Sequence, residues 1–198
     1  MRNMAFMKRV LRSERVAWFV VTFWVMLIAV SIPYARDIQA IVSASLGREA
    51  FTVAVFLFLI AAGSVIGHNL KRQTLASGIA SLLWAVGVIG ICALWTVKLS
   101  DNAEESIHIV EYGVLSLLLF YALSFRVDDW TVYIAASLFC AFIGGLDEMI
   151  QWLTPQRFFD FRDIRLNAAA GVLAQIVVWK GIRPEFVKPC LSLRGMRL

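Results

Sequence analysis

The residues best suited to chemistry lie in the second half of the chain, inside or beside long apolar runs. One such run opens with Glu105, His108, Glu111 and Tyr112. Residues three and four positions apart share one face of a helix, so Glu104, His108, Glu111, Tyr112 and Leu115 are expected to project from the same face. An ionisable group inside an apolar helix is costly to bury, so Glu111 is expected to face other helices. Its expected partner is His108 or an arginine of the last loop.

Two further segments bring acids, amides and an arginine. The next apolar run ends with Asp147, Glu148 and Gln151, and the following loop and last run carry Arg157, Asp163 and Asn167. We expect Asp163 to cap the last helix. The small residues Gly144, Gly145 and Gly171 indicate close helix packing beside these polar groups.

These residue types allow three kinds of chemistry. Arginines presented with aromatic residues suit a phosphate or carboxylate ligand with an apolar body. Carboxylates beside a histidine could act as general acid and base on a lipid headgroup, and the same types line proton or ion paths. The sequence has no nucleophile elbow, phosphate loop or metal-ligand set, so no metal and no cofactor is predicted. Whether any reaction is catalysed stays open.

The elements that must position these residues follow from composition. Of 198 residues, 60% are hydrophobic and 17% are charged, whereas soluble domains average about 45–50% apolar and about 25% charged. Six apolar runs cover about residues 16–34, 50–67, 75–97, 106–125, 130–153 and 164–179. Backbone groups in hydrocarbon must be satisfied within their own element, so the runs are predicted to be helices. The expected fold is an all-α integral membrane bundle of about six transmembrane helices.

The basic residues predict the orientation of this bundle. Thirteen lysines and arginines fall at the two termini and in the loops on the same side, against six on the other side. Both termini are therefore expected in the cytoplasm, with the polar segments at the extracytoplasmic face of the membrane. The net charge of +5 lies beside apolar runs, which indicates anionic lipid headgroups rather than nucleic acid.

This orientation divides the chain into four parts. We expect a cytoplasmic basic N-terminus (1–15), a three-span half (16–97), a second three-span half with the polar cluster (98–183) and a cytoplasmic basic tail (184–198). The first outer loop, Arg36–Leu46, is expected to form a short helix at the membrane interface. Three scattered cysteines do not make a disulfide framework.

The ordered set of polar residues resembles the VanZ-like family of bacterial membrane proteins. The resemblance covers about residues 100–175, and the residues that carry it are Glu105, His108, Glu111, Tyr112, Gly113, Asp147, Glu148, Gln151, Pro155, Arg157, Asp160, Asp163, Asn167 and Gly171. The founding member of that family is associated with reduced susceptibility to the glycopeptide teicoplanin, although most members are not tied to resistance. Many members have Lys where this chain has Glu105, so this chain has one cation fewer.

The residues and the resemblance together favour a binding or modulating role at the cell surface. The expected ligand is a membrane lipid, a lipid-linked wall precursor or an amphiphilic glycopeptide. The residues expected to contact it are His108, Glu111, Tyr112, Asp147, Glu148, Gln151, Arg157, Asp163 and Asn167. A lipid-headgroup enzyme and, less strongly, a proton or ion path are the alternatives. The sequence does not indicate an oligomeric state.

Overall fold

All regular structure in the described part of the chain is helical. The computed structural model describes residues 13–70, 73–99, 105–155 and 159–182. The elements are α2 (Glu14–Ser31), η1 (Ile32–Tyr34), α3 (Ala35–Leu46), α4 (Glu49–Leu70), α5 (Leu75–Lys98), α6 (Ile107–Leu123), α7 (Thr131–Leu153), α8 (Phe161–Ile176) and η3 (Val177–Ile182). This confirms the predicted all-α membrane fold.

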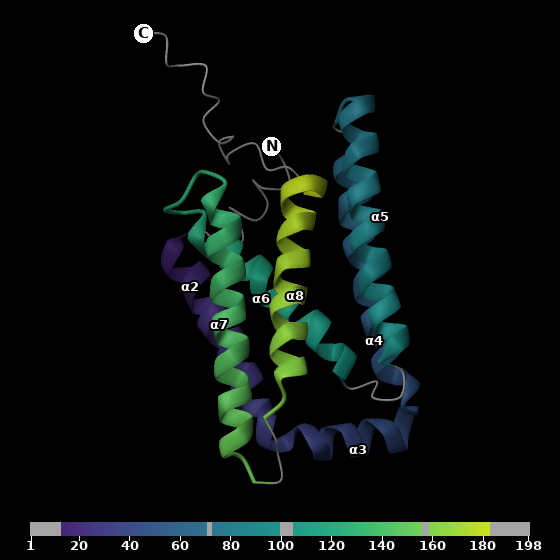
Figure 1. Cartoon of the computed structure of the whole chain (residues 1–198), viewed down its shortest axis with the longest axis vertical. Coiled ribbons are helices and arrows are strands. Elements are labelled where there is room, and N and C mark those ends of the chain that lie inside the picture. The colour runs from purple at the N-terminus through teal and green to yellow at the C-terminus, as the bar shows by residue number, and fades with distance from the viewer. Residues whose placement is uncertain (1–12, 71–72, 100–104, 156–158, 183–198) are drawn as a thin grey trace.

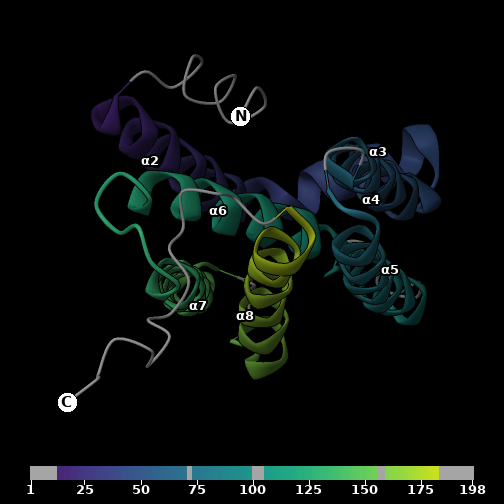
Figure 2. The same cartoon turned by 90° about the horizontal axis from the view of Figure 1, so that it is seen from above.

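Apart from α3, the α-helices of the described residues run between two ends of the bundle, and α3 crosses one of those ends (Figure 1). The start of α2 and the end of η3 lie toward the opposite end. We call the end that α3 crosses the α3 end; the starts of α6 and α8 and the last turn of α7 also lie there. Seen from above, α2, α6, α7 and α8 form one group, with α4 and α5 beside it (Figure 2).

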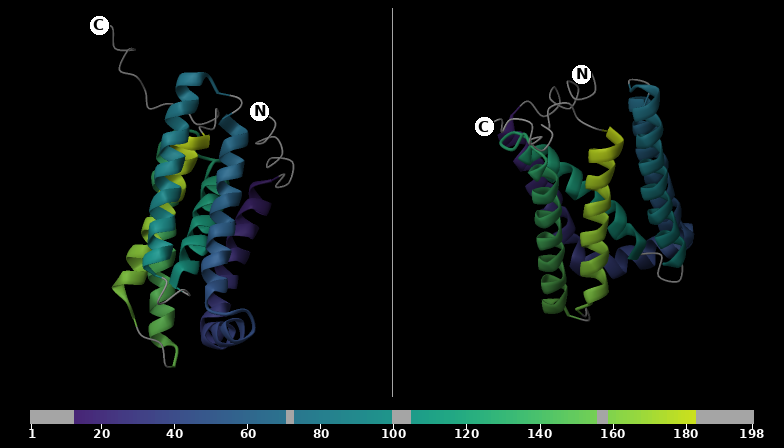
Figure 3. Two further views of the ribbon diagram at one scale, coloured as in Figure 1. Left: turned by 90° about the vertical axis from the view of Figure 1, so that its right-hand side faces the viewer. Right: turned by 45° about the horizontal axis from the view of Figure 1, so that its top comes forward.

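The outer helices have the surface of a membrane protein. Among the described residues, four helical segments are long and apolar enough to cross a bilayer, by length and composition: Glu14–Leu46, Glu49–Leu70, Leu75–Lys98 and Thr131–Leu153. They expose large apolar side chains such as Phe19, Leu83 and Phe142. Two turned views show that α6 and α8 run beside the longer helices (Figure 3). Because α6 and α8 pack mainly on protein, they can be shorter, and α8 can be more polar.

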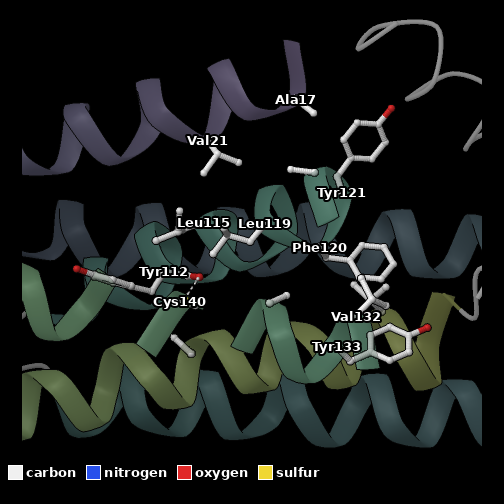
Figure 4. Close-up of a cluster of buried hydrophobic side chains, with 14 residues drawn as sticks. Ala17, Val21, Tyr112, Leu115, Leu119, Phe120, Tyr121, Val132, Tyr133 and Cys140 are labelled. Atoms are coloured by element: carbon white, nitrogen blue, oxygen red, sulfur yellow. Dashed lines mark hydrogen bonds between the residues drawn. The ribbon is translucent and has the colours of Figure 1, made fainter. Parts of the chain in front are cut away.

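The main core lies where α6 meets α2 and α7. Leu115 and Leu119 of α6 face Val21 of α2, and Phe120 of α6 lies beside Val132 of α7 (Figure 4). A second, smaller cluster joins α4 and α5 to α6 and includes Val55 and Ile109. The two cores fix α6 on both sides, so the start of α6 is held firmly at the α3 end.

Small residues let α7 and α8 come close together. A Cβ added at Gly144 would lie 2.9 Å from the Cβ of Asn167, and one added at Gly171 would lie 2.7 Å from Cys140 Sγ. These contacts agree with the close packing expected of Gly144 and Gly171. Gly145 differs, because a Cβ there would meet nothing within 4 Å.

Polar side chains also join the central helices. Ser116 of α6 donates to the Gly171 carbonyl at 2.9 Å, and Gln175 of α8 donates to the Ser116 carbonyl and hydroxyl, each at 2.8 Å. Trp24 of α2 donates its indole N–H to the Glu111 carbonyl at 3.1 Å. These hydrogen bonds between helices fix the positions of α2 and α8 along α6.

The predicted interfacial segment is the helix α3, which lies across the bundle (Figure 1). It exposes Ile38, Ile41 and Leu46 and has no buried residue. Gly47 ends it with φ +83° and ψ 158°, a conformation that is essentially restricted to glycine. This residue allows the chain to leave α3 and turn into α4.

Candidate functional site

The start of α6 holds the expected histidine–glutamate pair. His108 Nδ1 lies 3.3 Å from Glu111 Oε2, and both side chains are only partly buried. The His108 ring lies 6.1 Å from the Tyr112 ring, measured between centroids. The pairing of Glu111 with His108, one of the two partners considered, shows that these groups share one face of α6.

The last turns of α7 hold the second set of acids. Gln151 Nε2 donates to Glu148 Oε1 at 3.0 Å and lies 3.3 Å from Asp147 Oδ2. Glu148 is fully buried, and its other oxygen accepts the Asp160 backbone N–H at 3.0 Å. Both Glu148 oxygens are therefore satisfied by the protein, and the side chain ties the end of α7 to the start of α8.

The cap of α8 differs from the one predicted. Asp160, not Asp163, is the N-cap, and its side chain accepts the Arg162 backbone N–H at 2.7 Å. Asp160 has the extended backbone that a cap requires, whereas Asp163 already lies in the first turn. The helix therefore begins three residues earlier than the apolar run suggested, and Asp163 lies in its first turn.

Several buried polar atoms at the α3 end have no hydrogen-bond partner among the described residues. They include Tyr112 Oη, Asp147 Oδ1 and the Nδ2 and Oδ1 atoms of Asn167. The Tyr112 hydroxyl lies close to the Asp147 carboxyl group, so each of these two groups is a potential hydrogen-bond partner of the other. Tyr112 and Asn167 are fully buried, and Asp147 is 5% exposed. Since buried polar atoms are nearly always satisfied, Tyr112 and Asp147 can pair with each other after a small shift, and the atoms that then remain can be satisfied by ordered water or a ligand.

Asp147 lines a cavity of about 410 Å³ under α3, which we call the α3 chamber. Its polar lining consists of Ser31, Arg36, Gln39, Glu105, His108, Glu111, Asp147, Gln151 and Asp163. Apolar residues such as Ile28 and Phe51 complete it. This volume lies in the range of small-molecule sites, far above the space that one water needs.

A second cavity, of about 390 Å³, lies between the end of α5 and the start of α8; we call it the basic recess. It is lined by Lys98, Arg162 and Arg165 together with apolar residues such as Trp95. Arg162 Nη2 lies 3.4 Å from Glu105 Oε2, and this ion pair joins α8 to the start of α6. Glu105 and Asp163 line both the recess and the α3 chamber, so the two spaces are neighbours.

The structure brings most of the predicted site residues to one place. His108, Glu111, Asp147, Gln151 and Asp163 line the α3 chamber. Tyr112, Glu148 and Asn167 are buried on the same three helices but are not part of its lining. Glu104 and Arg157 lie outside the described residues. Within the described ranges, no group of three or more His, Cys, Asp or Glu side chains could hold a metal ion.

Sequence reasoning missed the part of the chamber that comes from the first half of the chain. Ser31 of α2, Arg36 and Gln39 of α3, and Phe51 of α4 all line it. A usable signal was present, because Arg36 and Gln39 lie one helical turn apart in the predicted interfacial helix. Lys98, the last residue of α5, likewise lines the basic recess together with Arg162 and Arg165.

Comparison with known proteins agrees with this architecture. Searches of curated proteins and of solved structures gave no match to this chain. The sequence pattern of the VanZ/LLP1 family matches residues 16–183, and so includes the helices that supply both halves of the chamber. The match covers most of the chain, and the protein is a membrane protein that belongs to the VanZ/LLP1 family.

Proposed function

We propose that this protein binds the headgroup of a membrane amphiphile, either a lipid or a lipid-linked precursor, in the α3 chamber. We place it in the bacterial cytoplasmic membrane with both termini in the cytoplasm and the α3 end outside. The excess of lysine and arginine at the termini supports this orientation. The common end reached by the start of α2 and the end of η3 also supports it (Figure 1).

The observation that carries the proposal is the Asp147 carboxyl group. It is 5% exposed and lines the chamber, and its Oδ1 atom has no hydrogen-bond partner among the described residues. Gln151 and the Tyr112 hydroxyl lie beside it. Leaving a buried acceptor unsatisfied costs about 1–3 kcal/mol, more for a charged group. A polar ligand group or a ligand-linked water that reaches Oδ1 would recover that cost.

The surroundings of the chamber favour an amphiphile over a free solute. The helix α3 covers the chamber with Arg36 and Gln39 while exposing Ile41 and Leu46. A helix with this division of polar and apolar side chains lies in the interface between headgroups and acyl chains. A headgroup can therefore enter the chamber from the membrane surface while its acyl or polyprenyl chain stays in the lipid.

Native mass spectrometry of the detergent-solubilised protein tests this proposal. The probe is the polar lipid extract of a bacterial inner membrane, added to delipidated protein. Wild type is expected to retain a lipid adduct, and Asp147→Asn is expected to lose most of it. Gln39→Trp, which fills the chamber from α3, is expected to lose it as well.

Matched variants on α3 separate chamber filling from general damage. Ala40→Trp adds the same bulk at the next position, which is exposed and does not line the chamber, and it should retain the adduct. Gln39→Trp keeps the test valid if Asp147→Asn does not fold. Equal lipid retention by wild type and Gln39→Trp, with both proteins folded by gel filtration and thermal unfolding, would overturn the proposal.

A further inference from the structure

We infer that the α3 chamber takes the ammonium group, and the basic recess the phosphate, of one aminoalkyl phosphate headgroup. This inference rests on the proposed function and names its ligand class. It starts from the opposite charges of two neighbouring cavities that share Glu105 and Asp163 as a common wall.

The chamber is acidic. Its ionisable lining consists of the carboxyl groups of Glu105, Glu111, Asp147 and Asp163 and the basic side chains of Arg36 and His108. His108 is paired with Glu111, and Glu105 is paired with Arg162. An anionic headgroup would meet like charge here, whereas a cation would meet complementary charge from several sides.

Asp147 provides the specific acceptor for that cation. Its Oδ2 atom is 3.3 Å from Gln151 Nε2, and its Oδ1 atom makes no hydrogen bond among the described residues, although the Tyr112 hydroxyl lies close to the same carboxyl group. An ammonium group offers three N–H donors and no acceptor. It can therefore donate one hydrogen bond to Oδ1 and another to a second oxygen of the chamber. A hydroxyl or methyl group at the same place carries no positive charge and would interact more weakly with the carboxylates.

The basic recess has the complementary chemistry. Three basic side chains, Lys98, Arg162 and Arg165, line it and outnumber the two carboxylates of the shared wall. The guanidinium group is suited to phosphate because it can donate two parallel hydrogen bonds. Trp95, Leu99 and Leu166 supply an apolar wall for the glycerol or chain end of the ligand. The Arg162–Glu105 pair at 3.4 Å lies at the boundary between the two cavities.

Because the two cavities share Glu105 and Asp163, a ligand that occupies both must carry its two charged groups close together. A phosphate and an ammonium group joined by a short alkyl chain can lie on opposite sides of Glu105 and Asp163. Phosphatidylethanolamine has this arrangement, and so does any lipid-linked precursor with an amine near its phosphate. Free phosphoethanolamine carries the same two groups without the lipid.

Two lipids that differ only in the ammonium group test the inference. Dioleoyl phosphatidylethanolamine and dioleoyl phosphatidylpropanol have the same phosphodiester and chains, with an ammonium replaced by a methyl group. Their affinities for the full-length protein are measured by native mass spectrometry titration. Wild type is expected to bind the ethanolamine lipid roughly tenfold more tightly, as one charge-assisted hydrogen bond would give.

Variants assign the two groups to the two cavities. Asp147→Asn and Glu111→Gln are expected to reduce the preference to about threefold or less, mainly by weakening the ethanolamine lipid; either variant suffices if the other does not fold. Arg165→Gln is expected to weaken both lipids by the same factor, since both carry the phosphate. Asp37→Asn removes an exposed carboxylate of α3 that does not line the chamber and should behave as wild type.

The outcomes separate this inference from the proposed function. Equal affinities for the two lipids in wild type, with Gln39→Trp weakening both, would overturn the ammonium assignment and leave headgroup binding standing. If neither lipid binds more weakly to Gln39→Trp or Asp147→Asn than to wild type, both the ammonium assignment and the proposed function are overturned. Competition by free phosphoethanolamine would support recognition of the headgroup alone, and selective binding without such competition would support recognition of the lipid-anchored form.

Discussion

Asn167 of α8 lies directly against Gly144 of α7, where a Cβ on the glycine would be 2.9 Å from the Asn167 Cβ. The same added atom would lie 3.4 Å from Cε1 of Tyr112 on α6. Helices α6, α7 and α8 therefore meet at Gly144, where the absence of a side chain allows their close approach. This contact holds the buried Asn167 amide and the Tyr112 ring next to the α3 chamber, and it sets how closely α7 can approach α8.

Replacing Gly144 with alanine should therefore destabilise the bundle. The new methyl group cannot fit without moving Asn167, and overpacking of this kind typically costs about 1–3 kcal/mol. The free energy of unfolding, measured by SDS titration of the protein in mild detergent, should fall by that amount. Binding of dioleoyl phosphatidylethanolamine should weaken as well, because the start of α8 must shift.

Gly145→Ala is the matched control for this change. It adds the same methyl group one position along α7, where nothing lies within 4 Å. Alanine is the better helix former by about 1 kcal/mol, so this variant should be as stable as wild type or more stable. A loss of stability in Gly145→Ala equal to that in Gly144→Ala would show that close packing is not the cause.

The difference between these two glycines shows what the sequence can and cannot predict. The fold class was predictable, because six apolar runs in a chain with 17% charged residues have few alternatives. The pair of glycines indicated a small-residue contact, but not which one makes it. That choice depends on the rotation of α7 about its axis, which is fixed by packing on α6 and α8 rather than by local sequence.

A similar limit applies to the candidate site. The pairing of His108 with Glu111 follows from their spacing on one helix, so it could be expected. The entry of Arg36 and Gln39 into the same cavity could not, because it depends on how α3 folds back across the bundle. The alpha-helical periodicity of each segment says nothing about contacts between residues that are about 70 or more positions apart.

The Ser116 hydroxyl should contribute to stability through its contacts with another helix. It donates to the Gly171 carbonyl and accepts from Gln175, so Ser116→Ala removes a donor and an acceptor between α6 and α8. Hydrogen bonds between membrane helices are worth about 0.6 kcal/mol on average and up to about 1.7. The same SDS titration should show a loss of about 1 kcal/mol.

Ser137→Ala serves as the comparison for Ser116. The Ser137 hydroxyl donates only to the Tyr133 carbonyl within its own helix, at 2.8 Å. Its loss leaves the helix ladder intact and should change stability by less than about 0.5 kcal/mol. If the two alanine variants lose the same stability, the contact between α6 and α8 is not what makes Ser116 important.

Replacing Glu148 with glutamine, which has nearly the same shape, should still destabilise the protein. Its two oxygens accept from the Gln151 side chain and the Asp160 backbone, and it is fully buried. The amide of Glu148→Gln has only one oxygen, so one of these donors would face an N–H group. We expect a loss of about 1–3 kcal/mol in the SDS titration, together with faster hydrogen exchange in the first turn of α8.

Exposed Glu49 gives the control for this substitution. It lies in the first turn of α4, and Glu49→Gln should change stability by less than about 0.5 kcal/mol. Wild-type exchange in the first turn of α8 for Glu148→Gln would contradict the role assigned to Glu148 in joining α7 to α8.

Gly47 should control how firmly α3 is held over the α3 chamber. Its φ of +83° with ψ of 158° costs any other residue about 1–3 kcal/mol. Gly47→Ala should therefore loosen the turn between α3 and α4, which raises hydrogen exchange in residues 35–46 and weakens binding of dioleoyl phosphatidylethanolamine. Gly67→Ala, inside α4 with open space around it, should change neither. Unchanged exchange in α3 of Gly47→Ala would mean that packing of α3 on α4, not the glycine turn, holds the cover in place.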